Sequence, residues 1–205
     1  MIPVTFIRKA LFPKKAASGT FHIDAGEGLH IRLLEEKDAG ALFALIDANR
    51  RDLREWLPWV DRTETLSDSI DFIRSALVQY RNCTGLHAGL WKDDSLIGVI
   101  GYVSIDVNNR KAMIGYWLAG PSRGKGYMTR ACAAMVDVAF RKLLFNKVEI
   151  YCGVGNLKSR AIPERLGFKP EGVLKQHEWV NDHFVDIVAY GMLSGEWAER
   201  KALKK

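Results

Sequence analysis

Glycines and basic residues alternate in one short stretch, Ser122-Arg-Gly-Lys-Gly-Tyr127, which lies between two regular apolar patterns. The residues before it alternate at period two, as in a strand, and the apolar residues from Met128 onward recur at helical spacing. The first turn of a helix has amides without partners inside the helix, and the helix dipole adds positive charge there. Glycines let a phosphate approach the backbone, and Arg123 and Lys125 add charge, so the stretch predicts an anion site.

A Gly-x-Gly sequence alone is more often a plain turn than a phosphate site, and two better-known phosphate motifs are absent. The chain lacks Gly-x-x-x-x-Gly-Lys-Ser/Thr, and Thr129 occupies the third glycine position of Gly-x-Gly-x-x-Gly. A second segment favours the phosphate interpretation. There a strand-like run, 147–152, is followed by Asn156-x-x-Ser159 and by a short helix pattern ending at Gly167.

Together these segments resemble the GNAT family of acetyl-CoA-dependent N-acetyltransferases, most closely its subgroup acting on the N-terminal serine or alanine of ribosomal proteins. The resemblance covers about residues 29–193. It rests on four motifs: Leu57-Pro-Trp59, Ile114-Gly-Tyr-Trp117, the segment 156–168, and the segment 186–190. Pro121 stands where the family motif has Gln or Arg. Because backbone amides are expected to bind the diphosphate, this departure weakens the match only slightly.

The resemblance implies direct acetyl transfer from acetyl-CoA to a primary amine, without a metal. It also implies which main-chain groups hold the coenzyme. The pantetheine arm would bind along Trp117, Leu118 and Ala119. The diphosphate would bind the amides of Arg123, Gly124, Lys125, Gly126 and Tyr127. Asn156 would hydrogen-bond the pantetheine arm, and Ser159 would donate a proton to the departing thiolate. Residue type alone favours helix capping for both Asn156 and Ser159, but the matched segment around them favours the coenzyme and catalytic roles.

Glu178 is the candidate general base, since it matches a family segment in which a glutamate deprotonates the amine through a water. The alternatives are that Glu178 is a solvent-facing strand residue or that Glu149 is the base. Asp186 interrupts an apolar run, which favours a paired structural acid over a contact to the acceptor. Trp56 and Trp59 lie in a region that borders the acceptor in the family, although their alternative role is core or lid packing.

A terminal amine with a pKa of about 8 needs less help from a base than a lysine side chain of about 10.4. The resemblance implies such an acceptor, the N-terminal α-amine of a protein, most simply a ribosomal one. Two alternatives stay open. One is a small amine such as a polyamine, aminoglycoside or amino acid, and the other is a non-catalytic module that binds acyl-CoA.

The apolar patterns predict an α/β (α+β) fold with strands and helices in one sheet-based domain. Strands are expected over 29–34, 86–91, 96–107, 112–119, 147–153, 172–180 and 183–192. Helices are expected over 35–49, 67–80, 128–143 and from 195 onward. By resemblance this is the GNAT fold, a mixed, mostly antiparallel sheet in which the strands 112–119 and 147–153 are splayed apart.

Composition suits one globular domain, since 48% of the 205 residues are hydrophobic and 26% are charged. We assign residues 24–205 to this domain and residues 1–23 to a basic extension. Four of the 30 basic residues and no acidic residue lie in that extension, so the domain opposes 26 basic to 24 acidic residues. Such a near balance does not favour direct nucleic-acid binding.

The cellular context is inferred from cysteines and apolar runs. Three scattered cysteines and five histidines form no zinc or disulfide pattern, which favours a reducing cytoplasm. No apolar run is long enough to span a membrane. Arg8 and Lys9 break the apolar part of the extension, which favours a surface segment over a targeting leader. Packing of that segment on a second subunit, in a homodimer, is a further expectation.

Overall fold

The computed structural model of this chain describes residues 21–203, so that residues 1–20 of the extension and residues 204–205 lie outside the described range. One eight-stranded sheet runs through the described part in the order β1-β2-β3-β4-β5-β6-β8-β7. All neighbouring strands are antiparallel except β5 and β6, which are parallel. This confirms the predicted mixed sheet. The strands are β1 His22–Asp24, β2 Leu29–Leu33, β3 Leu86–Lys92, β4 Ser95–Asp106, β5 Lys111–Leu118, β6 Lys147–Gly153, β7 Lys169–Val180 and β8 His183–Leu193.

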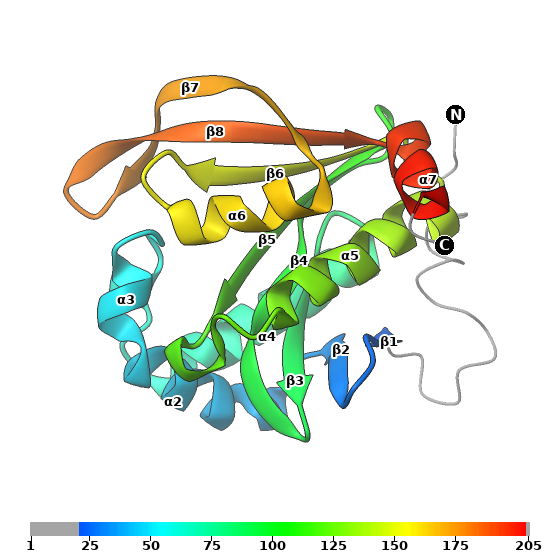
Figure 1. Cartoon of the computed structure of the whole chain (residues 1–205). Helices are drawn as coiled ribbons and strands as arrows, with labels where there is room; N and C mark the ends of the chain where they lie inside the picture. The colour runs from blue at the N-terminus through cyan, green and yellow to red at the C-terminus, as the bar shows by residue number, and fades with distance from the viewer. Residues whose placement is uncertain (1–20, 204–205) are drawn as a thin grey trace.

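Helices cover both faces of the sheet, as the buried apolar stripes require (Figure 1). On one face α2 packs against α4, and on the other α5 packs against α6. The helices are α2 Ala39–Ala48, α3 Arg50–Arg54, α4 Leu66–Asn82, α5 Tyr127–Asp137, α6 Leu157–Leu166 and α7 Ser194–Ala202. Short helical turns are η1 Glu36–Asp38, η2 Val60–Arg62, η3 Gly120–Ser122 and the π-helical η4 Val138–Lys142, which continues α5.

The central feature of the sheet is that β5 and β6 pair only at one end. Their register runs from Lys111 opposite Lys147 to Ile114 opposite Ile150 and then stops. Beyond it, β5 stays paired with β4 as far as Leu118, and β6 stays paired with β8 as far as Gly153. Each strand thus follows its outer partner, and the two halves of the sheet diverge, as Figure 1 shows to the left of β5 and β6.

The sheet reaches further toward the N-terminus than the sequence indicated. β1 pairs with β2 from His22 onward, and Phe21 before it is buried in the core at 7% exposure. The described fold therefore includes residues 21–23, which we had placed in the extension. A three-residue strand shows too little alternation to be recognised beside a basic segment.

Candidate active site

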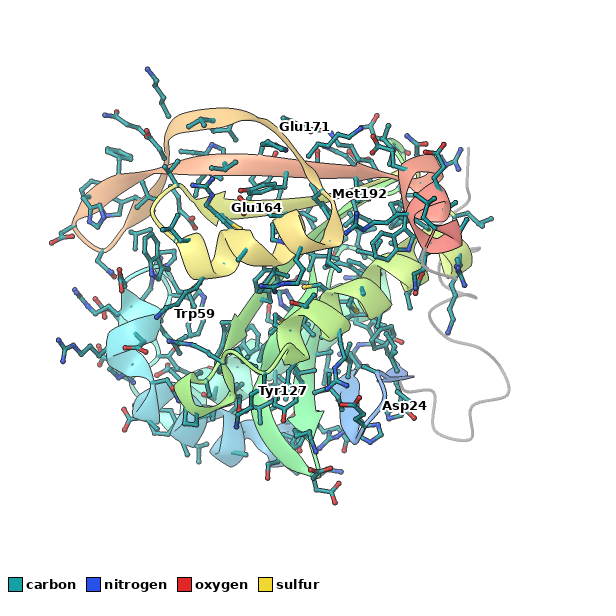
Figure 2. The ribbon with its side chains drawn as sticks, in the orientation of Figure 1. Asp24, Trp59, Tyr127, Glu164, Glu171 and Met192 are labelled. Carbon is teal, nitrogen blue, oxygen red and sulfur yellow. The ribbon has the colours of Figure 1, made fainter. Side chains whose placement is uncertain are left out.

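The glycine-rich stretch has the geometry of an anion cradle. Gly124 and Gly126 adopt left-handed φ values of +77° and +76°, which a side chain would strain. No atom lies within 4 Å of a Cβ built at either position, so this surface of the backbone is open. Gly126 is the N-cap of α5, and Tyr127 opens the helix (labelled in Figure 2). The first amides of α5 are therefore presented at an open surface where an anion can approach.

Arg123 holds this cradle in place. Its amide donates to the carbonyl oxygen of Gly120 at 3.1 Å, and its Nε donates to the carbonyl oxygen of Leu118 at 3.0 Å. Its Nη1 donates to the carboxylate of Asp52 at 2.7 Å, which joins the cradle to α3. The expected phosphate contact of the Arg123 amide is therefore not favoured, and that role falls to the amides after Arg123.

The main chain at the end of β5 also differs from expectation. The Ala119 amide donates to Ile97 on β4 at 2.9 Å, and its carbonyl accepts from Ser122 at 3.0 Å. In an antiparallel pair, every second residue of a strand directs its amide and carbonyl groups toward the same neighbouring strand. Trp117, two residues before Ala119, therefore also directs its main-chain groups toward β4. The main-chain groups of Tyr116 and the amide of Leu118 are left facing the gap between β5 and β6, whereas the Leu118 carbonyl oxygen already accepts from Arg123 Nε. The main-chain groups of Trp117 and Ala119, for which coenzyme contacts are expected, are thus hydrogen-bonded within the protein instead of facing the gap.

A cluster of three polar side chains lies where β5 and β6 separate. The Ser159 Oγ is 3.3 Å from the Cys152 Sγ and donates to the Tyr116 hydroxyl at 3.4 Å. The Tyr116 hydroxyl itself donates to the Ser159 carbonyl oxygen at 3.0 Å. Burial raises the pKa of Tyr116 well above its usual value, and burial also raises the pKa of the Cys152 thiol. Both neighbours therefore stay protonated at neutral pH, and the two hydroxyl-bearing residues, Tyr116 and Ser159, are half-buried.

Asn156 caps α6, as its residue type alone had suggested. Its Oδ1 accepts from the amide of Ser159 at 3.0 Å. This bond fixes the first turn of α6, where Ser159 is the third residue, and leaves the Asn156 amide nitrogen as the group for a ligand. Capping and coenzyme binding are thus compatible, and the coenzyme role of Asn156 stays a prediction.

A hydrogen-bonded network holds α6 on β8. The buried Tyr190 hydroxyl donates to Glu164 Oε1 at 2.6 Å and accepts from Arg160 Nε at 2.9 Å. Arg160 Nη1 also donates to the carbonyl oxygen of Val154 at 2.8 Å. Glu164 is labelled on α6 in Figure 2. The segments 156–168 and 186–190, distant in sequence, thus meet here and fix the helix that carries Ser159.

Removal of the Tyr190 hydroxyl tests this network. Tyr190→Phe is expected to lower the free energy of unfolding by about 1 to 2 kcal/mol, because it takes away a buried partner of two charged groups. Urea denaturation measures this loss. Tyr151→Phe is the matched control, since the contact that the structure shows for Tyr151 is made by its ring, with His177. Equal effects of the two substitutions would contradict the network's contribution.

Glu178 lies on the opposite face of the sheet from Ser159. Cys152, beside Ser159, faces the α5 and α6 side, so Gly153 next to it faces the other side. A Cβ built on Gly153 would lie 3.3 Å from Val185 of β8, which is the register partner of Glu178. Glu178, on the edge strand β7, is therefore on this second face, where its partner Val185 on β8 lies beside the end of β6. Burial raises the pKa of Glu178, while His177 acts in the opposite direction.

The two tryptophans lie across the open end of the two strands. The Trp56 ring packs against Gly153 and Gly155, with 3.0 and 3.2 Å to their Cβ positions. The Trp59 ring, labelled in Figure 2, lies 6.2 Å from that of Trp117 on β5. The segment from α3 to η2 therefore spans the gap and contacts both strands. The contact of Trp56 and Trp59 with the acceptor stays a prediction.

A polar cavity of 680 Å³ adjoins Trp56. It lies between the α3 segment and the turn from β7 to β8, where the Asn181 Nδ2 donates to the carbonyl oxygen of Arg54 at 2.5 Å. The lining residues are Arg51, Asp52, Arg54, Glu55, Trp56, Asn181, Asp182 and His183. It is an open surface depression, and its basic and acidic groups are close to balanced.

Glu149, the alternative base, lies at the paired end of β5 and β6 rather than at the open end. It is buried, and its carboxylate is 3.2 Å from Lys111 Nζ and 3.3 Å from Lys147 Nζ. Because its carboxylate is occupied by these two ion pairs and lies where β5 and β6 are still hydrogen-bonded to each other, the structure does not favour Glu149 as the base. Asp186 has the expected structural partner, because its Oδ1 accepts from the amide of Gln176 at 2.7 Å.

Within residues 21–203 the structure has no group of three or more metal-ligating side chains that would hold an ion. No helix in the same range is both long and apolar enough to cross a membrane. The described features are instead an open helix N-terminus, a gap between two strands, and a hydroxyl and a carboxyl on its two sides. Such a site fits an extended ligand with a diphosphate at one end and a reactive acyl group at the other, and so defines an acyl-CoA-dependent transferase.

Comparison with known proteins gives the family. A family model described as an acetyltransferase (GNAT) domain matches residues 29–169. YdaF of Bacillus subtilis (strain 168), whose name provisionally assigns it as a ribosomal N-acetyltransferase, is 41% identical over 186 residues, covering 88% of this chain and 100% of YdaF. The ribosomal-protein-serine acetyltransferase of Escherichia coli (strain K12) is 29% identical over 171 residues, covering 83% of this chain and 96% of that enzyme.

A solved structure agrees with these relatives. The microcin C7 self-immunity acetyltransferase MccE, in complex with acetyl-CoA and AMP, matches with a TM-score of 0.81 at 29% identity. The match covers 83% of this chain and 95% of that chain. This chain belongs to the GNAT acetyltransferase family and is an acyltransferase that uses acetyl-CoA.

Proposed function

We propose that this acetyltransferase transfers the acetyl group directly to the N-terminal α-amine of a protein, with a ribosomal protein as the acceptor class that its relatives suggest. The observation that supports the proposal is that Ser159 lies beside the end of β6 on one face of the sheet, while Glu178 on β7 lies on the other face, opposite Val185 near the same end. A donor and an acceptor that enter from opposite faces would meet between these two side chains.

In this proposal, each residue of the site has a role that follows from its position. The amides after Arg123 would hold the diphosphate, and the gap-facing main chain of Tyr116 and Leu118 would align the pantetheine arm. Acetyl-CoA supplies an activated thioester. On one face, Ser159 donates a proton to the departing thiolate, supported by the protonated Tyr116 beside it. On the other face, Glu178 accepts a proton from the amine, directly or through a water.

The character of the acceptor side supports a peptide. The open depression beside Trp56 has a nearly balanced charge, which does not fit a polycation such as a polyamine. The raised pKa of Glu178 is suited to an amine whose own pKa is about 8. We further propose a cytoplasmic location, since Cys132 and Cys152 are buried thiols outside any disulfide.

A panel of acceptors tests the proposal. Release of free CoA thiol is measured with peptides that begin with serine or alanine, with the same peptides blocked at the N-terminus but carrying a lysine, and with spermidine, an aminoglycoside and free amino acids. We expect turnover on the free N-terminal peptides, with the acetyl group mapped to the α-amine by mass spectrometry. Turnover confined to small amines would favour the alternative acceptor class, and binding without turnover on any amine would indicate a non-catalytic module.

A further inference from the structure

The strand that carries Glu178 contains a large irregularity just before it. Leu174 of β7 pairs with Ile187 of β8, and the next pair is Glu178 with Val185. Three residues of β7, 175–177, therefore lie opposite the single residue Asp186. Gln176 in this bulge has a φ of +49°, a left-handed conformation that is costly for a residue with a side chain. Such a bulge persists only where the surrounding structure supports it.

Asp186 provides that support from the facing strand. Its Oδ1 accepts from the Gln176 amide at 2.7 Å, at the residue with the strained backbone. Its carbonyl oxygen accepts from the Val154 amide at 2.9 Å, directly after the Gly153 that forms a wall of the site. One half-buried residue thus connects the bulge of β7 with the end of β6.

The bulge decides where along β8 Glu178 is placed. A regular ladder continued from Leu174 and Ile187 would put Gln176 opposite Val185 and Glu178 opposite His183. That shift of two residues would leave Glu178 on the same face but move it by about 7 Å toward the turn. A general base must be within hydrogen-bond reach of its proton or of one water, so a displacement of this size removes it from the site.

We propose that Asp186 is a positioning residue for the acetyl transfer: its carboxylate holds the bulge 175–177 in the conformation that places Glu178 opposite Val185 at the open end of β5 and β6. The inference rests on the proposed role of Glu178 as base. It assigns Asp186 no contact with either substrate.

Substitutions of Asp186 separate positioning from simple stabilisation. Asp186→Ala is expected to lower kcat by about 10- to 100-fold and to flatten the acid side of the pH profile, without changing the Kd for acetyl-CoA. Asp186→Asn keeps an oxygen acceptor for the Gln176 amide and should restore kcat to near the wild-type value. Addition of Asp186→Ala to Glu178→Gln should cause little further loss, because both changes remove the same group from the site.

The outcomes distinguish a positioning role of Asp186 from a purely stabilising one. If Asp186→Ala lowers only the thermal midpoint while kcat and the pH profile stay at wild-type values, the positioning role is wrong. The role is also wrong if Asp186→Asn folds but does not recover kcat. If Asp186→Ala does not fold, it is measured together with Gln176→Gly, which relieves the positive φ and should give a folded protein with the same flattened profile. If Glu178→Gln itself leaves kcat and the profile unchanged, the proposed base fails instead, independently of Asp186.

Discussion

Glu178→Gln is expected to lower kcat at neutral pH by about 100-fold or more, with little change in the KM for acetyl-CoA, because the amine loses its proton acceptor. The dependence of kcat on pH tests the same role of Glu178. Burial raises the pKa of Glu178, so wild-type kcat should fall as the pH drops through that raised value. The residual activity of the variant should lack this acid side and follow only the ionisation of the amine.

Glu171→Gln is the matched control for this substitution. Glu171 is also on β7, but its carboxylate pairs with Lys147 at 2.6 Å, toward the paired end of β5 and β6. We expect the kcat and the pH profile of the Glu171→Gln variant to equal those of the wild-type enzyme. A Glu178→Gln variant with a wild-type profile would show that the amine loses its proton to water or to another group.

The same pKa shift predicts how stability responds to pH. A raised pKa means that the folded chain binds this proton more tightly than the unfolded chain does. The stabilisation is full below the unfolded pKa, near the usual value of 4.5, and declines as the pH rises through the folded pKa. At neutral pH the wild-type protein contains a partly desolvated carboxylate that Glu178→Gln lacks. The variant should therefore be at least as stable in urea, and its lost activity would not come from unfolding.

Regular elements of the fold could be predicted from residue patterns because each satisfies a local rule. The alternation in β5, the helical stripe of α5 and the turn at Asp93 and Asp94, whose φ values are +45° and +63°, are all properties of neighbouring residues. β1 could not be predicted, because it is three residues long and is stabilised by pairing with β2 and by burial of Phe21. Such tertiary contributions leave no periodic pattern in the sequence.

In the candidate site, too, some features follow from local sequence and others depend on tertiary contacts. The glycines of the cradle could be recognised from the sequence, since glycine is the residue type that tolerates a positive φ such as that of Gly126. The neighbours of Ser159 carried none, because Tyr116 and Cys152 come from two strands whose divergence depends on the rest of the sheet. Asp186 was recognisable as an unusual acid, but the bulge opposite it depends on the register between β7 and β8.

Gly126→Val is expected to raise the Kd for CoA by about 100-fold or more. A β-branched side chain is disfavoured at a φ of +76°, and its Cβ would enter the open surface where the diphosphate is expected. Loss of one or two hydrogen bonds to a charged group, each contributing about 1.5 to 3 kcal/mol, accounts for a change of this size. Calorimetric titration with CoA measures it directly.

Gly26→Val separates this effect from backbone strain. Gly26 has a φ of +80° and likewise no atom within 4 Å of its Cβ position, but it lies in the turn between β1 and β2. Both variants should lose similar stability, and only Gly126→Val should lose affinity for CoA. Acetyl-pantetheine, which lacks the diphosphate, should be used equally well by Gly126→Val and by the wild-type enzyme. Equal loss with both donors, or unchanged CoA affinity, would show that the diphosphate does not bind at the start of α5.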